Sequence, residues 1–154
     1  MAVFDFNDLL ADLDPLAEDV VAAVTTEERM AAFAEMRDRL VDHFEAVEPT
    51  LYAALRRFPH FALVLMEADR ARDDIRLALT SLSLLPPDSH AWMGMFMALD
   101  GGVRRYFGDT EARLVDVAGR ALGEGELRRL GVEANRIRGV YAADHAEEET
   151  VGES

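Results

Sequence analysis

The chain contains no cysteine. Disulfides, thiolate metal sites and cysteine nucleophiles are therefore excluded, while the redox compartment is left open. Positive charge is also scarce, since 30 acidic residues stand against 16 basic ones and give a formal net charge of -14. Such an excess repels nucleic acid and anionic membrane surfaces. We expect neither of them as a partner.

A long apolar run is missing as well. The longest one, residues 61–66, is far too short to cross a bilayer. Residues 1–5 carry neither the basic segment nor the apolar segment with which a secretory leader begins. We therefore expect a cytoplasmic protein without membrane contact.

What the chain does contain is the composition of a helical protein. Half of its 154 residues are apolar, and Ala, Leu, Val and Met outweigh Ile and Thr. This composition favours helices, and a chain of this length can bury a core within one ordinary domain. We expect an all-α domain over residues 1–146, followed by a mobile acidic tail over residues 147–154.

Apolar residues recur at helical spacing in five segments. The first begins with Asp14 as an N-cap before Pro15, and the second begins at a capping box over residues 25–28. The expected helices cover residues 14–24, 27–57, 61–82, 92–122 and 126–143. Because the connections between the first four are short, neighbouring helices should run antiparallel. We expect an up-down-up-down four-helix bundle with an additional C-terminal helix.

Two places within these helices should be irregular. Pro49 removes a backbone donor from the second helix and should bend it. Gly101 and Gly102 weaken the fourth helix, although its apolar stripe resumes in phase through Val103 and Tyr106. We interpret the fourth segment as one helix with a soft point.

Three apolar stripes each contain one polar residue. His43 lies in the stripe of the second helix, Arg72 in that of the third and Tyr106 in that of the fourth. A stripe at this spacing faces the core, so we expect the three side chains to meet near the middle of the bundle. Asp14 is a weaker fourth member, because it also serves as the expected cap of the first helix.

Two segments give the chain a resemblance to a known family. Residues 43–52 read HFEAVEPTLY, and residues 106–114 read YFGDTEARL and are followed by further helical apolar positions as far as Leu130. They resemble the second and fourth helices of hemerythrin-type cation-binding proteins, four-helix bundles that hold two irons with histidines and carboxylates. The resemblance covers most of the chain and implies the same fold.

The resemblance also implies metal ligands, and His43 alone keeps the expected identity. The carboxylate expected four residues later is Val47, which cannot coordinate a metal. The third-helix histidine is replaced by Arg72, a fixed cation that opposes a metal.

The other ligand positions differ too. The fourth-helix histidine and glutamate are replaced by Tyr106 and Thr110, and the first-helix histidine aligns with Asp14. Since a di-iron centre needs several imidazoles and bridging carboxylates, we expect no di-iron site, no other metal and no cofactor.

The remaining polar groups suit acid–base chemistry. His43 can titrate near neutrality, Tyr106 supplies a phenol and Arg72 a permanent positive charge. A buried Arg72 needs an anion. If that anion is a ligand, the vacated interior binds an anionic or carbonyl-bearing small molecule and His43 moves a proton. If it is a carboxylate of the chain, such as Asp14 or Asp69, the cluster only stabilises the fold.

These observations favour a hemerythrin-like bundle that has lost its iron, binds a small molecule and acts as a cofactor-independent isomerase, cyclase or lyase. The candidate catalytic residues are His43, Tyr106 and Arg72, and the candidate ligand-binding residues are Asp14, Val47 and Thr110. One alternative is a non-catalytic binding or regulatory module with a protein partner or a second copy of itself. Another is a residual metal protein that uses His43 with Glu48 or Asp109.

Overall fold

The computed structural model describes the backbone of residues 6–152 and the surroundings of the side chains of residues 9–140. The described residues form helices and no strand, which confirms the all-α class. The helices are α1 (Phe6–Ala22), α2 (Thr26–Val47), η1 (Glu48–Tyr52, π-helical), α3 (Ala53–Arg56), η2 (Pro59–Phe61, a 3-10 turn), α4 (Ala62–Leu84), α5 (His90–Arg105), η3 (Tyr106–Glu111, π-helical), α6 (Ala112–Leu122) and α7 (Glu124–Gly152). Among the described residues, no helix has both the length and the apolar character needed to cross a bilayer.

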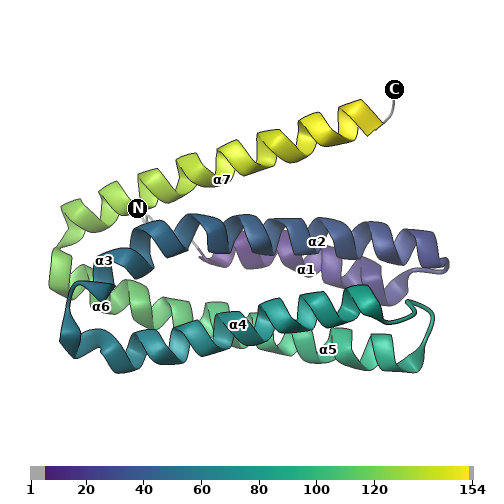
Figure 1. The fold of residues 1–154 in the computed structure, drawn as a ribbon, viewed down its shortest axis with the longest axis horizontal. Helices are drawn as coiled ribbons and strands as arrows, with labels where there is room; N and C mark the ends of the chain where they lie inside the picture. The colour runs from purple at the N-terminus through teal and green to yellow at the C-terminus, as the bar shows by residue number, and fades with distance from the viewer. Residues whose placement is uncertain (1–5, 153–154) are drawn as a thin grey trace.

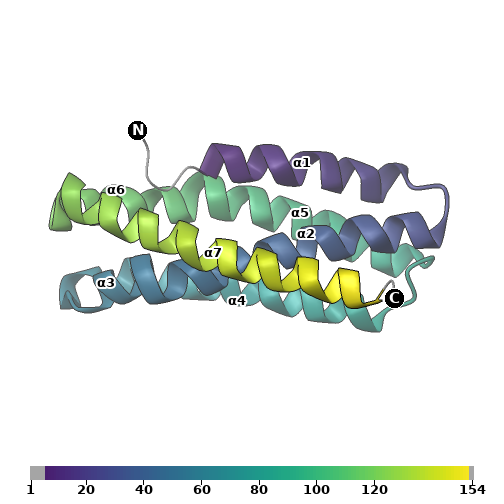
Figure 2. The ribbon, with the colours of Figure 1, turned by 90° about the horizontal axis from the view of Figure 1, so that it is seen from above.

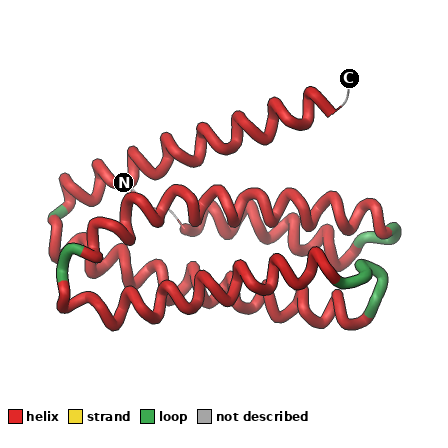
Figure 3. Tube along the Cα trace, viewed as in Figure 1, coloured by secondary structure: helices red, strands yellow, loops and turns green. Residues whose placement is uncertain are grey.

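The helices lie side by side as a bundle (Figures 1 and 2). α1 packs along α2, and α4 packs along α5. α7 contacts α2, η1 and α6 with its first half and diverges from α2 toward the C-terminus (Figure 1). Short loops connect the rods at the ends of the bundle (Figure 3). The core between the rods is apolar over most of its length and contains the side chains Phe33, Trp92 and Phe96 at one end.

Side-chain caps begin two helices, and the capping box over residues 25–28 is the one that the sequence predicts. Thr25 accepts a hydrogen bond from the backbone N–H of Glu28 at 3.1 Å, and the Glu28 carboxylate accepts from the N–H of Val24 at 3.3 Å. Ser89 accepts from the N–H of Trp92 at 3.2 Å and begins α5. Each cap satisfies backbone donors that have no partner inside the helix.

The expected start of the first helix is wrong. α1 begins at Phe6, so Asp14 is not a cap and Pro15 lies within the helix. The buried side chains of α1 are Leu13, Ala17 and Val20, whose helical spacing extends across Pro15. Packing of this face against α2 therefore outweighs the local preference of Asp-Pro for a helix start. Residues 1–5, on which the expectation about a leader rests, lie outside the described residues.

The last helix is longer than expected. α7 spans Glu124–Gly152 rather than ending near residue 143. Its polar sequence gives a weak apolar stripe, while its alanines and glutamates continue to favour a helix. The backbone of residues 147–152 is thus helical, and the mobility expected for residues 147–154 stays a prediction, with residues 153–154 outside the described part.

The two mid-helix irregularities are both π-helical segments. Pro49 lies in η1, so the expected disturbance of the second helix is confirmed at that place. In the fourth helix the disturbance lies in η3, just after the predicted soft point, while Gly101 and Gly102 belong to regular α5. α6 ends at Leu122, in agreement with the expected helix over residues 92–122, and Gly123 follows with a positive φ of 86°.

Candidate functional site

The interior holds a buried ionisable pair. Nε2 of His43 lies 2.8 Å from both carboxylate oxygens of Glu111. His43 comes from α2 and Glu111 from the end of η3, and their exposed fractions are 2% and 0%. A carboxylate buried to this extent has to be compensated by partners within the protein.

Helix α7 supplies the opposite charge. Nη1 of Arg138 is 3.2 Å from Nδ1 of His43. A guanidinium can only donate, so Nδ1 accepts, and the ring proton lies on Nε2 and is donated to Glu111. A neutral imidazole therefore connects an anion to a cation. Burial lowers the pKa of Arg138, and the charge of Glu111 opposes that shift.

Two tyrosines extend this chain of hydrogen bonds. The hydroxyl oxygens of Tyr52 and Tyr106 are 2.5 Å apart, and Tyr106 also hydrogen-bonds to Glu111. Since an ionised carboxylate only accepts, Tyr106 donates to Glu111 and accepts from Tyr52. Burial raises the pKa of Tyr106 and that of Tyr52, so both hydroxyls stay protonated. We call Arg138, His43, Glu111, Tyr106 and Tyr52 the buried network.

The π-helical turn η3 brings Tyr106 and Glu111 to the same side of their helix. They are five residues apart, which in an α-helix would separate their side chains by about 140° around the axis. The wider turn of η3 returns the fifth residue to the starting side. Glu111 thereby occupies the inward position that α-helical spacing assigns to Thr110.

The second π-helical segment has a similar effect on Tyr52. Pro49 has no N–H to donate, and the chain responds by forming the wider turn η1 around it. The wider turn shifts the direction in which the following side chains point. As a result, the consecutive residues Leu51 and Tyr52 are both fully buried. Sequence periodicity had assigned only Leu51 to the core.

Arg72 finds its anions within the chain. Its Nε is 3.0 Å from Oε1 of Glu48, although the N–H is not aligned with that oxygen, and its Nη1 is 3.1 Å from Oδ1 of Asp69. A longer contact of 3.4 Å reaches Asp73. The guanidinium carbon also lies 5.1 Å from the ring centroid of Tyr52, in cation–π geometry. Arg72 therefore borders the buried network and is neutralised by acidic residues.

The structure places the three candidate catalytic residues in one region. His43 and Tyr106 are joined through Glu111, and Arg72 touches Tyr52. Their proximity follows from contacts among five side chains and not from a shared open cavity.

The three candidate ligand-binding residues separate. Val47 is fully buried in the core. Thr110 lies in a groove described below. Asp14 does not face the interior: its side chain is 44% exposed and pairs with Arg104 at 2.8 Å. Asp14 therefore lies outside the buried network, and its assignment as a ligand-binding residue stays a prediction.

Three members of the buried network were missed by sequence reasoning. Glu111 and Tyr52 each follow a residue that fits the α-helical stripe. They could have been predicted only if the π-helical turns at Pro49 and after Tyr106, which shift the stripe by one residue, had been recognised. Arg138 lies on a polar helix and meets a residue 95 positions earlier in the chain. Nothing in the local pattern indicates that contact.

The residues at this place do not fit a di-iron centre. Across the described side chains, no group of three or more histidine or acidic residues is arranged to hold a metal ion. Both ring nitrogens of His43 already have partners, Glu111 and Arg138. A guanidinium beside the imidazole would also repel a metal cation.

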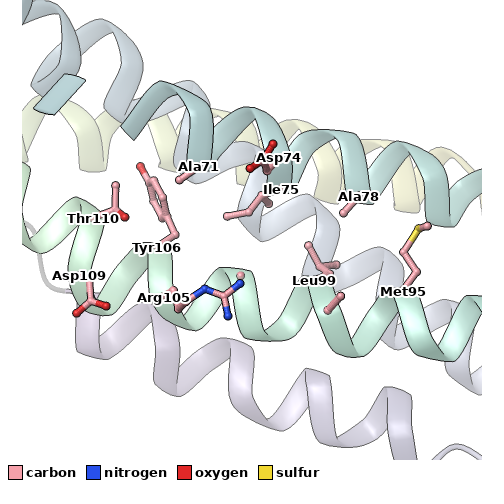
Figure 4. Close-up of a pocket in the computed structure, with 12 residues that line it drawn as sticks. Ala71, Asp74, Ile75, Ala78, Met95, Leu99, Arg105, Tyr106, Asp109 and Thr110 are labelled. Atoms are coloured by element: carbon pink, nitrogen blue, oxygen red, sulfur yellow. The ribbon is translucent and has the colours of Figure 1, made fainter. Parts of the chain in front are cut away.

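A groove of about 450 Å³ opens between α4 and the α5–η3 segment (Figure 4). Figure 4 shows Tyr106 and Thr110 at one end and Met95 at the other. Its wall is mainly apolar and includes Ala71, Ile75, Ala78, Met95, Ala98 and Leu99. Tyr106 is the one member of the buried network among the lining residues, so the groove and the network share this ring.

Arg105 is a cation at the edge of this groove. Within the described part of the chain it makes no ion pair, whereas its neighbour Arg104 pairs with Asp14 and Asp100. Its guanidinium folds back over α5, where a methyl group on Gly101 would lie 3.5 Å from Nη1 and one on Gly102 would lie 3.9 Å from Nη2. Both distances are ordinary van der Waals contacts, so the guanidinium lies against α5 at these two residues.

Comparison with known proteins adds no relative to this picture. No protein-family model, curated protein or solved structure matches the chain. The resemblance to hemerythrin-type proteins therefore stays a prediction that rests on the two segments of the sequence.

Proposed function

We propose that this protein is a hemerythrin-like, up-down-up-down helical bundle of the cytoplasm that works without iron and binds a small molecule. The binding site is the groove between α4 and α5, not the interior, because the buried network fills the place where the resemblance implies a metal. The observation that carries this proposal is the guanidinium of Arg105, which makes no ion pair within the described part of the chain and lies at the edge of an apolar groove.

The ligand is a small amphipathic molecule with a single carboxylate or a carbonyl group. Arg105 donates paired hydrogen bonds to the polar head, and the apolar body lies over Ile75 and Leu99. Asp74 and Asp109 also line the groove. Their negative charges disfavour polyanions such as nucleotides.

Calorimetric titration with decanoate, and with decanol as a neutral ligand of the same shape, tests this proposal. We expect decanoate to bind more tightly than decanol, and R105Q to weaken decanoate binding by about tenfold, or 1.4 kcal/mol. The matched control is R128Q, which removes an exposed arginine of α7. A second variant, A98L, should weaken both ligands by filling the groove. Failure of both ligands to bind, or equal losses in R105Q and R128Q, would contradict the proposal.

Acid–base catalysis has weaker support. Tyr106 both lines the groove and hydrogen-bonds to Glu111, which in turn pairs with His43. However, neither His43 nor Arg72 lines the groove, so no base of the buried network reaches a ligand there directly. We therefore propose binding as the function and a structural role for the network.

A further inference from the structure

The outward side of α4 carries a regular row of residues. The row, which we call the outer seam, consists of Leu63, Met66, Arg70, Asp73, Leu77, Thr80 and Leu84. Its members are spaced alternately by three and four residues, the spacing of the a and d positions of a coiled coil. Over this span an α-helix is about 33 Å long.

The apolar members of the outer seam are strongly exposed. The exposed fractions are 72% for Leu63, 61% for Met66, 66% for Leu77 and 80% for Leu84. Single exposed hydrophobic residues are common. Four large ones in one heptad row are typical of a surface that another helix covers.

The charges of the outer seam indicate which kind of helix covers it. Arg70 and Asp73 lie at its centre, and Arg70 makes no ion pair with any described residue. Among the described residues, Asp73 pairs only with Arg72, at 3.4 Å, and it remains 65% exposed. A parallel second copy would place Arg70 against Arg70 and Asp73 against Asp73. An antiparallel copy places each Arg70 against an Asp73, so the row is complementary to itself in that direction.

We propose that two copies of the chain associate through antiparallel packing of their outer seams. The register that sets Arg70 opposite Asp73 of the second copy also sets Met66 opposite Leu77 and Leu63 opposite Thr80. By two-fold symmetry each of these pairs occurs twice. All three pairs join an a position to a d position, as antiparallel helix packing requires.

The dimer is weak and reversible. One helix per copy provides less area than a standard interface of about 1,600 Å², and each copy carries a net charge of -14. On the flank of the seam, Glu67 is paired with Arg113 at 3.3 Å, which reduces its repulsion of Asp74 of the second copy. A micromolar dissociation constant is expected.

Sedimentation equilibrium over a range of micromolar concentrations tests this inference. R70D and D73R should each weaken the dimer at least tenfold, because each places like charges opposite one another. The double variant R70D/D73R should restore the wild-type dissociation constant. L77E should abolish dimerisation, while V132E, which changes an exposed valine of α7, should leave it unchanged. Circular dichroism checks that every variant stays folded.

Two results would overturn the proposal. One is a wild-type chain that stays monomeric at the highest concentration. The other is a folded double variant that remains as weak as the single ones, since that excludes the antiparallel register. The groove lies on a different side of α4, so L77E should still bind decanoate. Measuring decanoate binding by this variant therefore separates a failure of the dimer from a failure of the proposed function.

Discussion

Among single residues, Glu111 stands out as a fully buried carboxylate inside an apolar core. Glu111 accepts from His43 and from Tyr106, and Arg138 balances its charge across the imidazole. Within the buried network, both ring nitrogens of His43, the carboxylate of Glu111 and the two tyrosine hydroxyls all have hydrogen-bond partners, as low-dielectric surroundings demand. The sequence predicted the inward direction of His43 and Tyr106 from their stripes, because helical periodicity is a local property.

Replacing Glu111 by alanine should destabilise the protein by roughly 3 to 5 kcal/mol, the usual cost of breaking a buried pair from one side. The variant leaves Arg138 without its anion and leaves donors of His43 and Tyr106 without an acceptor. Urea unfolding followed by circular dichroism measures the loss. The control D109A removes an exposed carboxylate of the same turn and should change stability by less than about 0.5 kcal/mol. Equal effects would mean that Glu111 carries no special role.

Stability should fall in alkaline solution because burial raises the pKa of Tyr52 and of Tyr106. Below about pH 10 both are protonated in the folded and in the unfolded chain, so their contribution is complete. As the pH rises further, the unfolded tyrosines lose protons while the folded ones retain them. The free energy of unfolding then falls by about 1.4 kcal/mol per pH unit for each tyrosine. Y52F should reduce this slope, and an unchanged slope would contradict the assignment.

At the scale of elements, the two π-helical turns decide which side chains meet. Sequence patterns predicted the start of α2 from the capping box over residues 25–28, because caps act within one turn of the chain. They failed where packing against other helices decided, as at Pro15 within α1. They also failed to find the changes of phase in η1 and η3, since a π-helical turn has no strong sequence signal.

Deleting Gly108 from η3 should be tolerated. Gly108 is exposed, and its removal places Tyr106 and Glu111 four residues apart, on one face of an ordinary α-helix. We expect a cost of no more than about 1 kcal/mol, typical of a single substitution. Deleting the exposed Asp116 from regular α6 is the control, because it rotates all later residues by about 100°. Thermal unfolding compares the two, and equal losses would show that η3 does not act as a one-residue insertion.

The whole molecule combines a network that crosses the bundle with a strongly negative surface. α7 completes the network by bringing Arg138 to a histidine 95 residues away, a contact that no local pattern could predict. The excess of 14 negative charges could be counted from the sequence. Its energetic effect depends on folding, because the compact state brings those charges closer together than the unfolded chain does.

Sodium chloride should therefore raise the midpoint of thermal unfolding. Raising the salt from about 0.01 M to about 0.15 M shortens the Debye length from about 30 Å to about 8 Å and screens this repulsion. Exposed ion pairs such as Arg120–Asp116 are weakened too, but each contributes little. A dilute sample keeps association from contributing, and chloride avoids the separate stabilising effect of sulfate. A midpoint that falls steadily with salt would mean that surface ion pairs outweigh the repulsion.

Nitrogen-15 NMR spectra of the histidine rings, recorded with and without ferrous iron, test most directly whether the partners of His43 in the buried network keep this imidazole from binding a metal. H43Q identifies the signals of His43 among the four histidines. We predict a neutral ring at pH 7, protonated at Nε2 and bare at Nδ1, whose signals stay unchanged when iron is added without oxygen. Loss of the His43 signals by paramagnetic broadening would show that the imidazole binds iron and would contradict the account.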